Sequence, residues 1–330
     1  MLKVGINGFG RIGRLTMRAS LGQDKFEVVA INDLVDSTTL AHLLKYDSVY
    51  GKLATEVRAE AKGLLVGGKL VSVYSERDPV QIPWKESGVD LVIESTGRFR
   101  TRDAVSSHLK AGAKRVIITA PGEADAVIVL GVNENIYNPA EHIIISNASC
   151  TTNALAPLVK VLHKNFGVKK GLMNTTHAYT NDQQLLDLPH PDLRRSRAAA
   201  LSMIPTSTGA AKTVGEVIPE LKGKIDGLSV RVPTATVSVV DFVADLEQST
   251  TPAAVNEAFI KAAQGSKYLA FSDEPLVSAD YRGNPYSSTV DGLSTMVVGG
   301  NLARVMAWYD NEWAYSCRVV DLAAMIASAG

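Results

Sequence analysis

Short apolar runs and amphipathic segments alternate along the first half of the chain. The main runs are five to seven residues long, which is typical of buried strands. They cover residues 2–6, 26–32, 89–94 and 115–119, and further runs predict strands at 127–132 and 143–145. The segments with helical spacing cover 14–20, 38–45 and 102–111. Strands that alternate with helices in this way predict an α/β domain built on a parallel sheet.

The second half of the chain is richer in strands that follow one another directly. Strands are predicted at 171–177, 228–232, 237–246 and 296–308, and helices at 151–166, 210–217, 252–264 and 315–328. This order favours an α+β domain with an antiparallel sheet faced by helices. A chain of 330 residues is long enough for two domains. We therefore expect one domain over residues 1–149 and a second over 150–313.

A glycine-rich turn follows the first predicted strand. Gly8, Gly10 and Gly13 form the pattern G-x-G-x-x-G between that strand and a helix, where the backbone can approach a pyrophosphate at the helix N-terminus. Asp33 ends the next strand, 20 residues after Gly13, at the interval expected for the acid that binds an adenosine ribose. The pattern predicts a Rossmann-type domain that binds NAD, because the carboxylate repels the 2′-phosphate of NADP.

Cys150 stands where the apolar run 143–145 gives way to the helix 151–166. Ser149 or Thr151 can cap that helix, and the positive end of its dipole favours a thiolate. The alternative is a small buried residue at a junction, but the flanking hydroxyls are poor core groups and good donors to an anion. His177 ends a later strand beside a polar loop and is a candidate base, although a lone histidine is usually structural.

Several polar positions are candidates for binding anions, each with a plainer alternative. The loop 186–200 contains Arg195 among three arginines and is either a solvated surface loop, an anion site or a subunit contact. Thr208 and Gly209 precede the helix 210–217, an arrangement that can bind an anion. Arg231 alternates within a strand, so it faces either solvent or an anion. Arg77 lies in a loop and on its own would be interpreted as a solvated charge. Thr119 ends the predicted strand 115–119, where a loop begins.

Composition narrows the function further. The formal net charge is zero, which argues against a broad surface for nucleic acid or an acidic membrane. No apolar run approaches the roughly 18 residues of a membrane-spanning helix, and no signal peptide is expected at the N-terminus. Two cysteines, Cys150 and Cys317, are too few for a disulfide framework, so we expect a cytoplasmic location. The histidines are scattered and no metal site is expected.

These motifs resemble the phosphorylating glyceraldehyde-3-phosphate dehydrogenase of glycolysis. The likeness runs from about residue 4 to 325 and is most specific at 7–14, 148–153, 177–183, 205–212 and 308–313. It implies that Cys150 is the nucleophile and His177 its base. It implies cofactor contacts from Gly8, Gly10, Arg11, Ile12, Gly13, Asp33, Arg77, Thr119 and Asn311. It also implies that substrate and phosphate bind at Ser149, Thr151, Thr180, Arg195, Thr208, Gly209 and Arg231.

The same resemblance implies an activity and an assembly. The substrates would be glyceraldehyde 3-phosphate, inorganic phosphate and NAD, and the product 1,3-bisphosphoglycerate, formed through a hemithioacetal and a thioester on Cys150. Members are usually homotetramers, and their last helix, here 314–330, packs back on the first domain. The sequence departs from the family at Ala154, Ala314, Cys317 and a short loop at 122–125.

Three other functions compete with this one. A related phosphorylating dehydrogenase could act on erythrose 4-phosphate or a semialdehyde. A cofactor-free cysteine hydrolase would have no use for the segment from Gly8 to Asp33. A non-catalytic scaffold would have no need for Cys150 and His177, and both are present.

Overall fold

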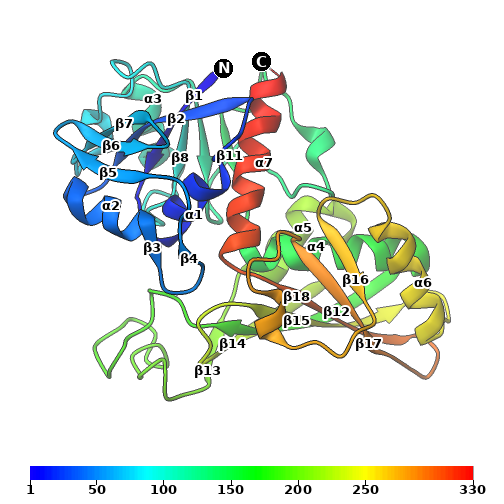
Figure 1. Ribbon diagram of the computed structural model, residues 1–330. Helices are drawn as coiled ribbons and strands as arrows, with labels where there is room; N and C mark the ends of the chain where they lie inside the picture. The colour runs from blue at the N-terminus through cyan, green and yellow to red at the C-terminus, as the bar shows by residue number, and fades with distance from the viewer. Residues whose placement is uncertain (330) are drawn as a thin grey trace. The chain divides into compact units, whose positions relative to one another are not determined.

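The computed structural model describes residues 1–329 and divides into two compact units (Figure 1). The first unit comprises residues 1–128, 135–148 and those from 316 onward, and the second comprises 129–134 and 149–315. The last helix, α7 (Trp313–Ala329), therefore begins in the second unit and has most of its length in the first.

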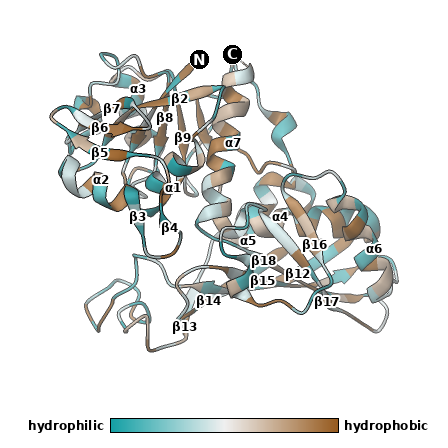
Figure 2. Ribbon diagram, in the orientation of Figure 1, coloured by the Kyte–Doolittle hydropathy of each residue, from teal (hydrophilic) through white to brown (hydrophobic). Residues whose placement is uncertain are grey.

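A mostly parallel sheet forms the centre of the first unit. Within residues 1–329 it has nine strands, in the order β10 (Ala126–Val127), β11 (Ile144–Ser146), β9 (Arg115–Ile118), β8 (Leu91–Glu94), β1 (Leu2–Asn7), β2 (Phe26–Asn32), β7 (Lys69–Tyr74), β6 (Gly63–Val66) and β5 (Val57–Glu60). The strands from β10 to β7 run parallel, and β5, β6 and β7 are antiparallel. The central strands are buried and largely apolar (Figure 2). The predicted Rossmann-type sheet is confirmed.

Helices and short elements connect these strands. The helices are α1 (Arg11–Ala19), α2 (Ser37–Lys45) and α3 (Arg102–Lys110), with the short ladder β3 (Tyr46–Asp47) and β4 (Gly51–Lys52) and the 3₁₀ turns η1 (Pro79–Gln81) and η2 (Glu134–Ile136). Asp36 and Thr101 cap α2 and α3 by accepting backbone N–H groups. The connections bring the ends of β1, β2 and β8 to one edge of the sheet, where α/β proteins bind ligands.

A second sheet forms the centre of the second unit. Among the described residues it has seven strands, in the order β13 (Ile204–Ser207), β14 (Ile225–Val232), β12 (Val168–Ala178), β15 (Ser238–Leu246), β18 (Leu302–Tyr309), β17 (Ser288–Val298) and β16 (Leu269–Ser272). Neighbours are antiparallel except for β12 with β14 and β16 with β17. Three helices contact strands of this sheet, namely α4 (Cys150–Phe166), α5 (Ala210–Val217) and α6 (Pro252–Ala263). The same unit contains the 3₁₀ turns η3 (Pro219–Leu221) and η4 (Ser278–Tyr281). The expected antiparallel sheet is confirmed, with two parallel pairs added.

The strand predicted at 127–132 is wrong. Only Ala126 and Val127 pair with a neighbouring strand, although Ile128 to Leu130 are buried. The Val129 N–H donates to the side chain of Asn133 at 2.8 Å, and the Val129 carbonyl accepts from Val132 and Asn133. A turn closed by an asparagine therefore replaces the ladder, because burial alone does not distinguish a strand from a packed turn.

No helix within residues 1–329 is long and apolar enough to span a bilayer.

Candidate active site

A cavity of about 310 Å³ lies in the first unit, at the edge where the parallel strands end. Four of the predicted cofactor residues line it, namely Gly8, Gly10, Asp33 and Arg77. The remaining lining includes Asn7, Asn32, Glu76, Ser95 and Thr96. The cavity therefore lies where the glycine-rich turn and the end of β2 come together.

Two glycines are required by the shape of this turn. Gly8 has a φ of +88°, and a Cβ there would lie 2.8 Å from the backbone nitrogen of Thr96. A Cβ on Gly13 would lie 2.2 Å from the carbonyl oxygen of Gly8. Helix α1 then begins at Arg11, directly after this turn, and the N-terminus of a helix carries the positive end of its dipole. This is a suitable cradle for a pyrophosphate.

Asp33 is fixed against the same turn. Its Oδ2 accepts from the Phe9 N–H at 2.7 Å, and its Oδ1 accepts from the Val35 N–H at 3.2 Å. The carboxylate is half-buried and lines the cavity, so it is available to a ribose hydroxyl. The glycine cradle and this acid together fit a dinucleotide such as NAD.

Within residues 1–329, the other predicted cofactor residues do not line the cavity. Arg11 pairs with Asp47 at 2.5 Å, and Ile12 and Gly13 form the first turn of α1. Thr119 follows β9 and donates to the carbonyl of Glu94 at 3.0 Å. Asn311 belongs to the second unit, where its Oδ1 accepts from the Ser238 hydroxyl at 2.9 Å.

Cys150 and His177 meet in the second unit. Cys150 is the first residue of α4, and Ser149 caps that helix by accepting from the Thr152 N–H at 3.0 Å. His177 is the next-to-last residue of β12. The Cys150 Sγ lies 3.5 Å from the His177 Nε2. The sequence thus predicted the two members of a nucleophile–base pair, and the structure places them in contact.

The surroundings of His177 determine its tautomer. Its Nδ1 lies 2.6 Å from the carbonyl oxygen of Ala178, which can only accept a hydrogen bond. The same Nδ1 also lies 3.1 Å from the Arg231 Nη1, which can only donate. The shorter contact, with Ala178, favours the proton on Nδ1, and in that tautomer the lone pair of Nε2 faces the Cys150 sulfur. The imidazole is thus oriented to take the proton of the thiol.

Burial controls the charge of this pair. It raises the pKa of the Cys150 thiol, a shift that Arg231 and the hydrogen bond from Thr151 oppose. Burial, and next the nearby Arg231, lowers the pKa of His177 to about 3. Both shifts oppose the thiolate that the helix dipole favours, because desolvation penalises the charged forms of the two groups.

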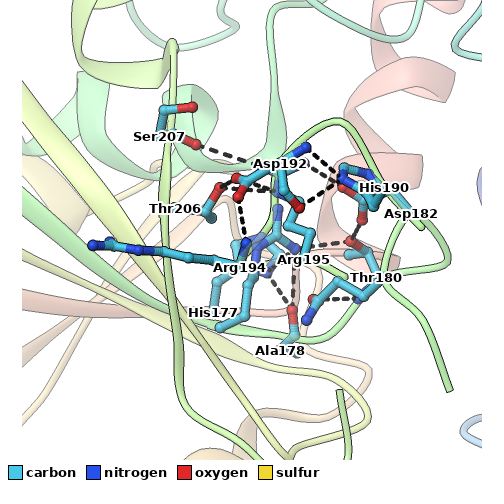
Figure 3. A network of polar contacts seen from close by, with 12 residues as sticks. His177, Ala178, Thr180, Asp182, His190, Asp192, Arg194, Arg195, Thr206 and Ser207 are labelled. Atoms are coloured by element: carbon cyan, nitrogen blue, oxygen red, sulfur yellow. Dashed lines mark hydrogen bonds and ion pairs between the residues drawn. The ribbon is translucent and has the colours of Figure 1, made fainter. Parts of the chain in front are cut away.

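A network of cations and hydroxyls lies next to His177 (Figure 3). Arg231 donates from Nη1 to Thr180 Oγ1 at 2.9 Å, and the same nitrogen lies 3.1 Å from the His177 Nδ1. The buried Nε of Arg231 has no hydrogen-bond partner among residues 1–329. Asp182 accepts from the Thr180 hydroxyl and pairs with Arg195 at 2.5 Å. The structure therefore gathers Thr180, Arg195 and Arg231, with a carboxylate among them.

A second group of predicted anion ligands surrounds the start of α4. The Thr152 hydroxyl donates to the Ala210 carbonyl at 3.4 Å, which brings the N-terminus of α4 close to that of α5. Thr208 and Gly209 immediately precede α5. The Thr151 hydroxyl bonds Tyr309 at 2.9 Å, and the Ser149 hydroxyl bonds Thr152. Two helix N-termini and these hydroxyls make a suitable phosphate site.

Sequence reasoning missed two residues of this site. Tyr309 ends β18, bonds both Thr151 and Thr175 at 2.9 Å, and packs its ring edge-on to His177. Asp182 organises Thr180 and Arg195. Tyr309 follows a predicted strand and Asp182 lies in the polar loop after His177, but neither position indicated which side chains it would contact. No group of three or more metal-ligating side chains occurs among the described residues.

Comparisons with known proteins place this chain in one family. Residues 2–102 match a family model described as glyceraldehyde 3-phosphate dehydrogenase, NAD binding domain, and residues 149–311 match the model of its C-terminal domain. The chain is 60% identical to glyceraldehyde-3-phosphate dehydrogenase of Geobacillus stearothermophilus, over 100% of this chain and 99% of that protein.

Two further relatives carry the same name. Identity is 58% to glyceraldehyde-3-phosphate dehydrogenase 1 of Bacillus cereus, over 100% of each chain. It is also 58% to glyceraldehyde-3-phosphate dehydrogenase 1 of Bacillus subtilis (strain 168), over 100% of this chain and 99% of that protein. Neither name supports the erythrose 4-phosphate alternative. The resemblance expected from the sequence is confirmed, and the chain belongs to the glyceraldehyde-3-phosphate dehydrogenase family.

Proposed function

We propose that this protein oxidises glyceraldehyde 3-phosphate with NAD and inorganic phosphate to give 1,3-bisphosphoglycerate. The observation that carries the proposal is the 3.5 Å contact between the Cys150 Sγ and the Nε2 of His177. A thiol beside an uncharged imidazole can add to an aldehyde once the imidazole accepts its proton.

The chain's own groups supply the proton transfers. Cys150 adds to the aldehyde carbon as His177 moves the thiol proton to the carbonyl oxygen, which gives a hemithioacetal. The hemithioacetal hydroxyl then returns a proton to the His177 Nε2 as the carbon loses a hydride. When bound, NAD supplies the acceptor of that hydride. Inorganic phosphate attacks the resulting thioester, and the released sulfur is reprotonated.

Two anion sites serve the two phosphate groups. Anions would bind beside His177 at Thr180, Arg195 and Arg231. In support of this role, the buried Nε of Arg231 has no hydrogen-bond partner among the described residues. Ser149, Thr151, Thr208 and Gly209 would hold a phosphate between the starts of α4 and α5. Occupation of either site by an anion would favour the charged form of His177 during the reaction.

In this proposal the two domains of the chain have different roles. Residues 1–149 bind NAD through the cavity at Gly8, Gly10, Asp33 and Arg77. Further contacts would come from Arg11, Ile12, Gly13 and Thr119 of the same domain and from Asn311 of the second. Residues 150–313 carry out the chemistry, and the predicted helix 314–330, of which residue 330 lies outside the described residues, would pack back on the first domain. Asp33 favours NAD over NADP because its carboxylate repels a 2′-phosphate.

Assembly into a homotetramer is part of the proposal. The loop that follows β12 exposes large apolar side chains, with Leu185 81%, Leu193 81% and Leu201 79% exposed. The second sheet exposes others on one face, namely Leu172, Met296, Val298 and Leu302. Two separate apolar surfaces suit two kinds of contact between identical chains. We place the enzyme in the cytoplasm, where a reactive free cysteine stays reduced.

Replacing the nucleophile tests the proposed chemistry. Cys150→Ser should nearly abolish the formation of reduced nicotinamide from aldehyde, NAD and phosphate, and should leave NAD binding intact. Alkylation should modify Cys150 faster than Cys317, since the His177 imidazole lies 3.5 Å from the Cys150 sulfur. A fully active serine variant, or equal labelling of the two cysteines, would contradict the assignment.

A further inference from the structure

Three polar side chains end neighbouring strands of the first sheet at one level. Asn32, Asn7 and Glu94 are the last residues of β2, β1 and β8, and Asn7 is the register partner of both others. Register partners in a parallel sheet project from the same face. All three are nearly fully buried, with 4%, 2% and 1% exposed. Such a row is unfavourable unless its polar atoms are hydrogen-bonded.

One end of the row is fixed by a tryptophan. The indole of Trp84 can only donate, and its Nε1 lies 3.1 Å from the Nδ1 of His108. The Nδ1 is therefore the acceptor, and the proton of this fully buried histidine is on Nε2. That Nε2 lies 2.9 Å from Glu94 Oε2, to which it must donate.

The other end is fixed by a backbone segment. The N–H of Glu76 donates to Asn32 Oδ1 at 2.8 Å, and Asn32 Nδ2 donates to the Glu76 carbonyl at 2.9 Å. The same Nδ2 donates to Asn7 Oδ1 at 2.8 Å. The amide of Asn7 is thereby oriented so that its Nδ2 donates to Glu94 Oε2 at 2.6 Å.

Both chains of hydrogen bonds therefore end on Glu94 with a donor. Its second oxygen, Oε1, accepts from the N–H of Thr96 at 2.8 Å and from the Thr96 hydroxyl at 2.5 Å. The Thr96 hydroxyl is free to donate because it accepts from the Arg98 N–H. The described residues thus offer Glu94 four donors, which only an ionised carboxylate can accept without conflict.

Glu94 does not line the cofactor cavity itself, but its hydrogen-bond partners Asn7 and Thr96 do. Asn7, Asn32, Glu76 and Thr96 all line the cavity. Thr96 also packs on Gly8, where a Cβ would lie 2.8 Å from its nitrogen. The position of the Gly8 turn therefore follows from where Glu94 holds Asn7 and Thr96.

We propose that Glu94 is the positioning residue of the cofactor cavity, a buried carboxylate that fixes Asn7 and Thr96 beneath the Gly8 turn. The proposal rests on the proposed function for the location of NAD. Substitution of Glu94 should then weaken binding of the cofactor in particular, whereas a purely structural residue would change stability alone.

The test compares Glu94→Gln with Ile93→Ala. Glutamine keeps the volume but turns an NH₂ group toward donors, and Ile93→Ala opens space on the opposite face of the same buried strand. We expect Glu94→Gln to weaken NAD binding, measured by calorimetry, about tenfold, with KM for NAD rising in parallel and KM for phosphate unchanged. Ile93→Ala should lower the unfolding temperature and leave NAD binding unchanged.

The outcomes separate the two proposals. If Asp33→Gly weakens NAD binding and Glu94→Gln does not, or if Ile93→Ala weakens it as much as Glu94→Gln, the positioning role is wrong. If neither Asp33→Gly nor Glu94→Gln weakens NAD binding, the cofactor is located elsewhere. A measurement on the unmodified protein is independent of variant folding: ¹⁵N NMR should show the proton of His108 on Nε2, and a proton on Nδ1 would overturn the network.

Discussion

At the scale of single residues, the charge of the Cys150–His177 pair depends on desolvation. A helix N-terminus and a neighbouring imidazole predict a thiolate, but burial raises the pKa of the thiol and lowers that of the imidazole, beside which Arg231 stands. Burial penalises both charged forms and therefore opposes a thiolate–imidazolium pair in the ligand-free protein. In the proposed reaction the imidazole is a base that takes up a proton and not a standing counter-ion.

This assignment predicts how stability depends on pH. The pKa of His177 is about 3 in the folded protein and about 6.5 in the unfolded chain. Between these values the unfolded state binds the extra proton, so the folded state loses stability as the pH falls. Above about pH 6.5 His177 contributes no pH dependence.

The measurement is the free energy of unfolding by urea at several pH values, for the unmodified protein and for His177→Asn. As the pH falls from 6.5 toward 3, the unmodified protein should lose up to about 1.4 kcal/mol per pH unit more than the variant. The two curves should run parallel above pH 6.5. Parallel curves throughout would show that His177 is not held neutral by burial.

The sequence identified the residues of the proposed chemistry more readily than the partners that the structure gives them. Cys150 and His177 stand out because each lies at the end of a predicted strand or the start of a predicted helix. Tyr309 and Glu94 do not stand out, because their partners are distant in sequence: Tyr309 bonds Thr151 across 158 positions, and Glu94 bonds Asn7 across 87. Local patterns carry no information about such pairs.

At the scale of elements, helix starts connect folding to anion binding. Ser149 caps α4, and Thr251 caps α6 by accepting from the Ala254 N–H at 3.2 Å. Only the first cap lies in the proposed phosphate site. The two caps therefore form a matched pair that separates a structural contribution from a functional one.

Replacing each cap with alanine should lower stability by about 1 kcal/mol. Ser149→Ala should also raise KM for phosphate, because a hydroxyl of the proposed phosphate site is lost. Thr251→Ala should leave that KM unchanged. Thermal unfolding and steady-state kinetics measure the two effects, and an unchanged KM in Ser149→Ala would remove Ser149 from the phosphate site.

Element boundaries followed the local signals where caps or breaks were clear. Helix α5 covers the predicted residues 210–217, and β2 covers the predicted 26–32. The strand predicted at 127–132 failed because Asn133 closes a turn with its side chain, which an apolar run does not reveal. The parallel pairing of β12 with β14 depends on register across the sheet and is absent from any local pattern.

At the scale of the whole molecule, the second unit presents two apolar surfaces. We call the first the sheet surface, formed by Leu172, Met296, Val298 and Leu302. Register places their positions on one face, since Leu172 aligns with Val243, Val243 with Arg304, and Arg304 with Met296. The second is the loop surface, formed by Leu185, Leu186, Leu193, Leu201 and Met203, all more than 70% exposed.

Each surface should form its own two-fold contact between identical chains, because a self-complementary patch pairs with its copy. Leu172→Asp should break the sheet contact and Leu201→Asp the loop contact, so each variant should sediment as a dimer and the double variant as a monomer. Leu70→Asp is the control, since Leu70 is 53% exposed in the first unit and belongs to neither surface. Sedimentation velocity of all four variants and the unmodified protein gives the masses. A tetramer that survives both single substitutions would show that these surfaces do not hold it together. Two distinct dimers would assign one interface to the sheet surface and the other to the loop surface.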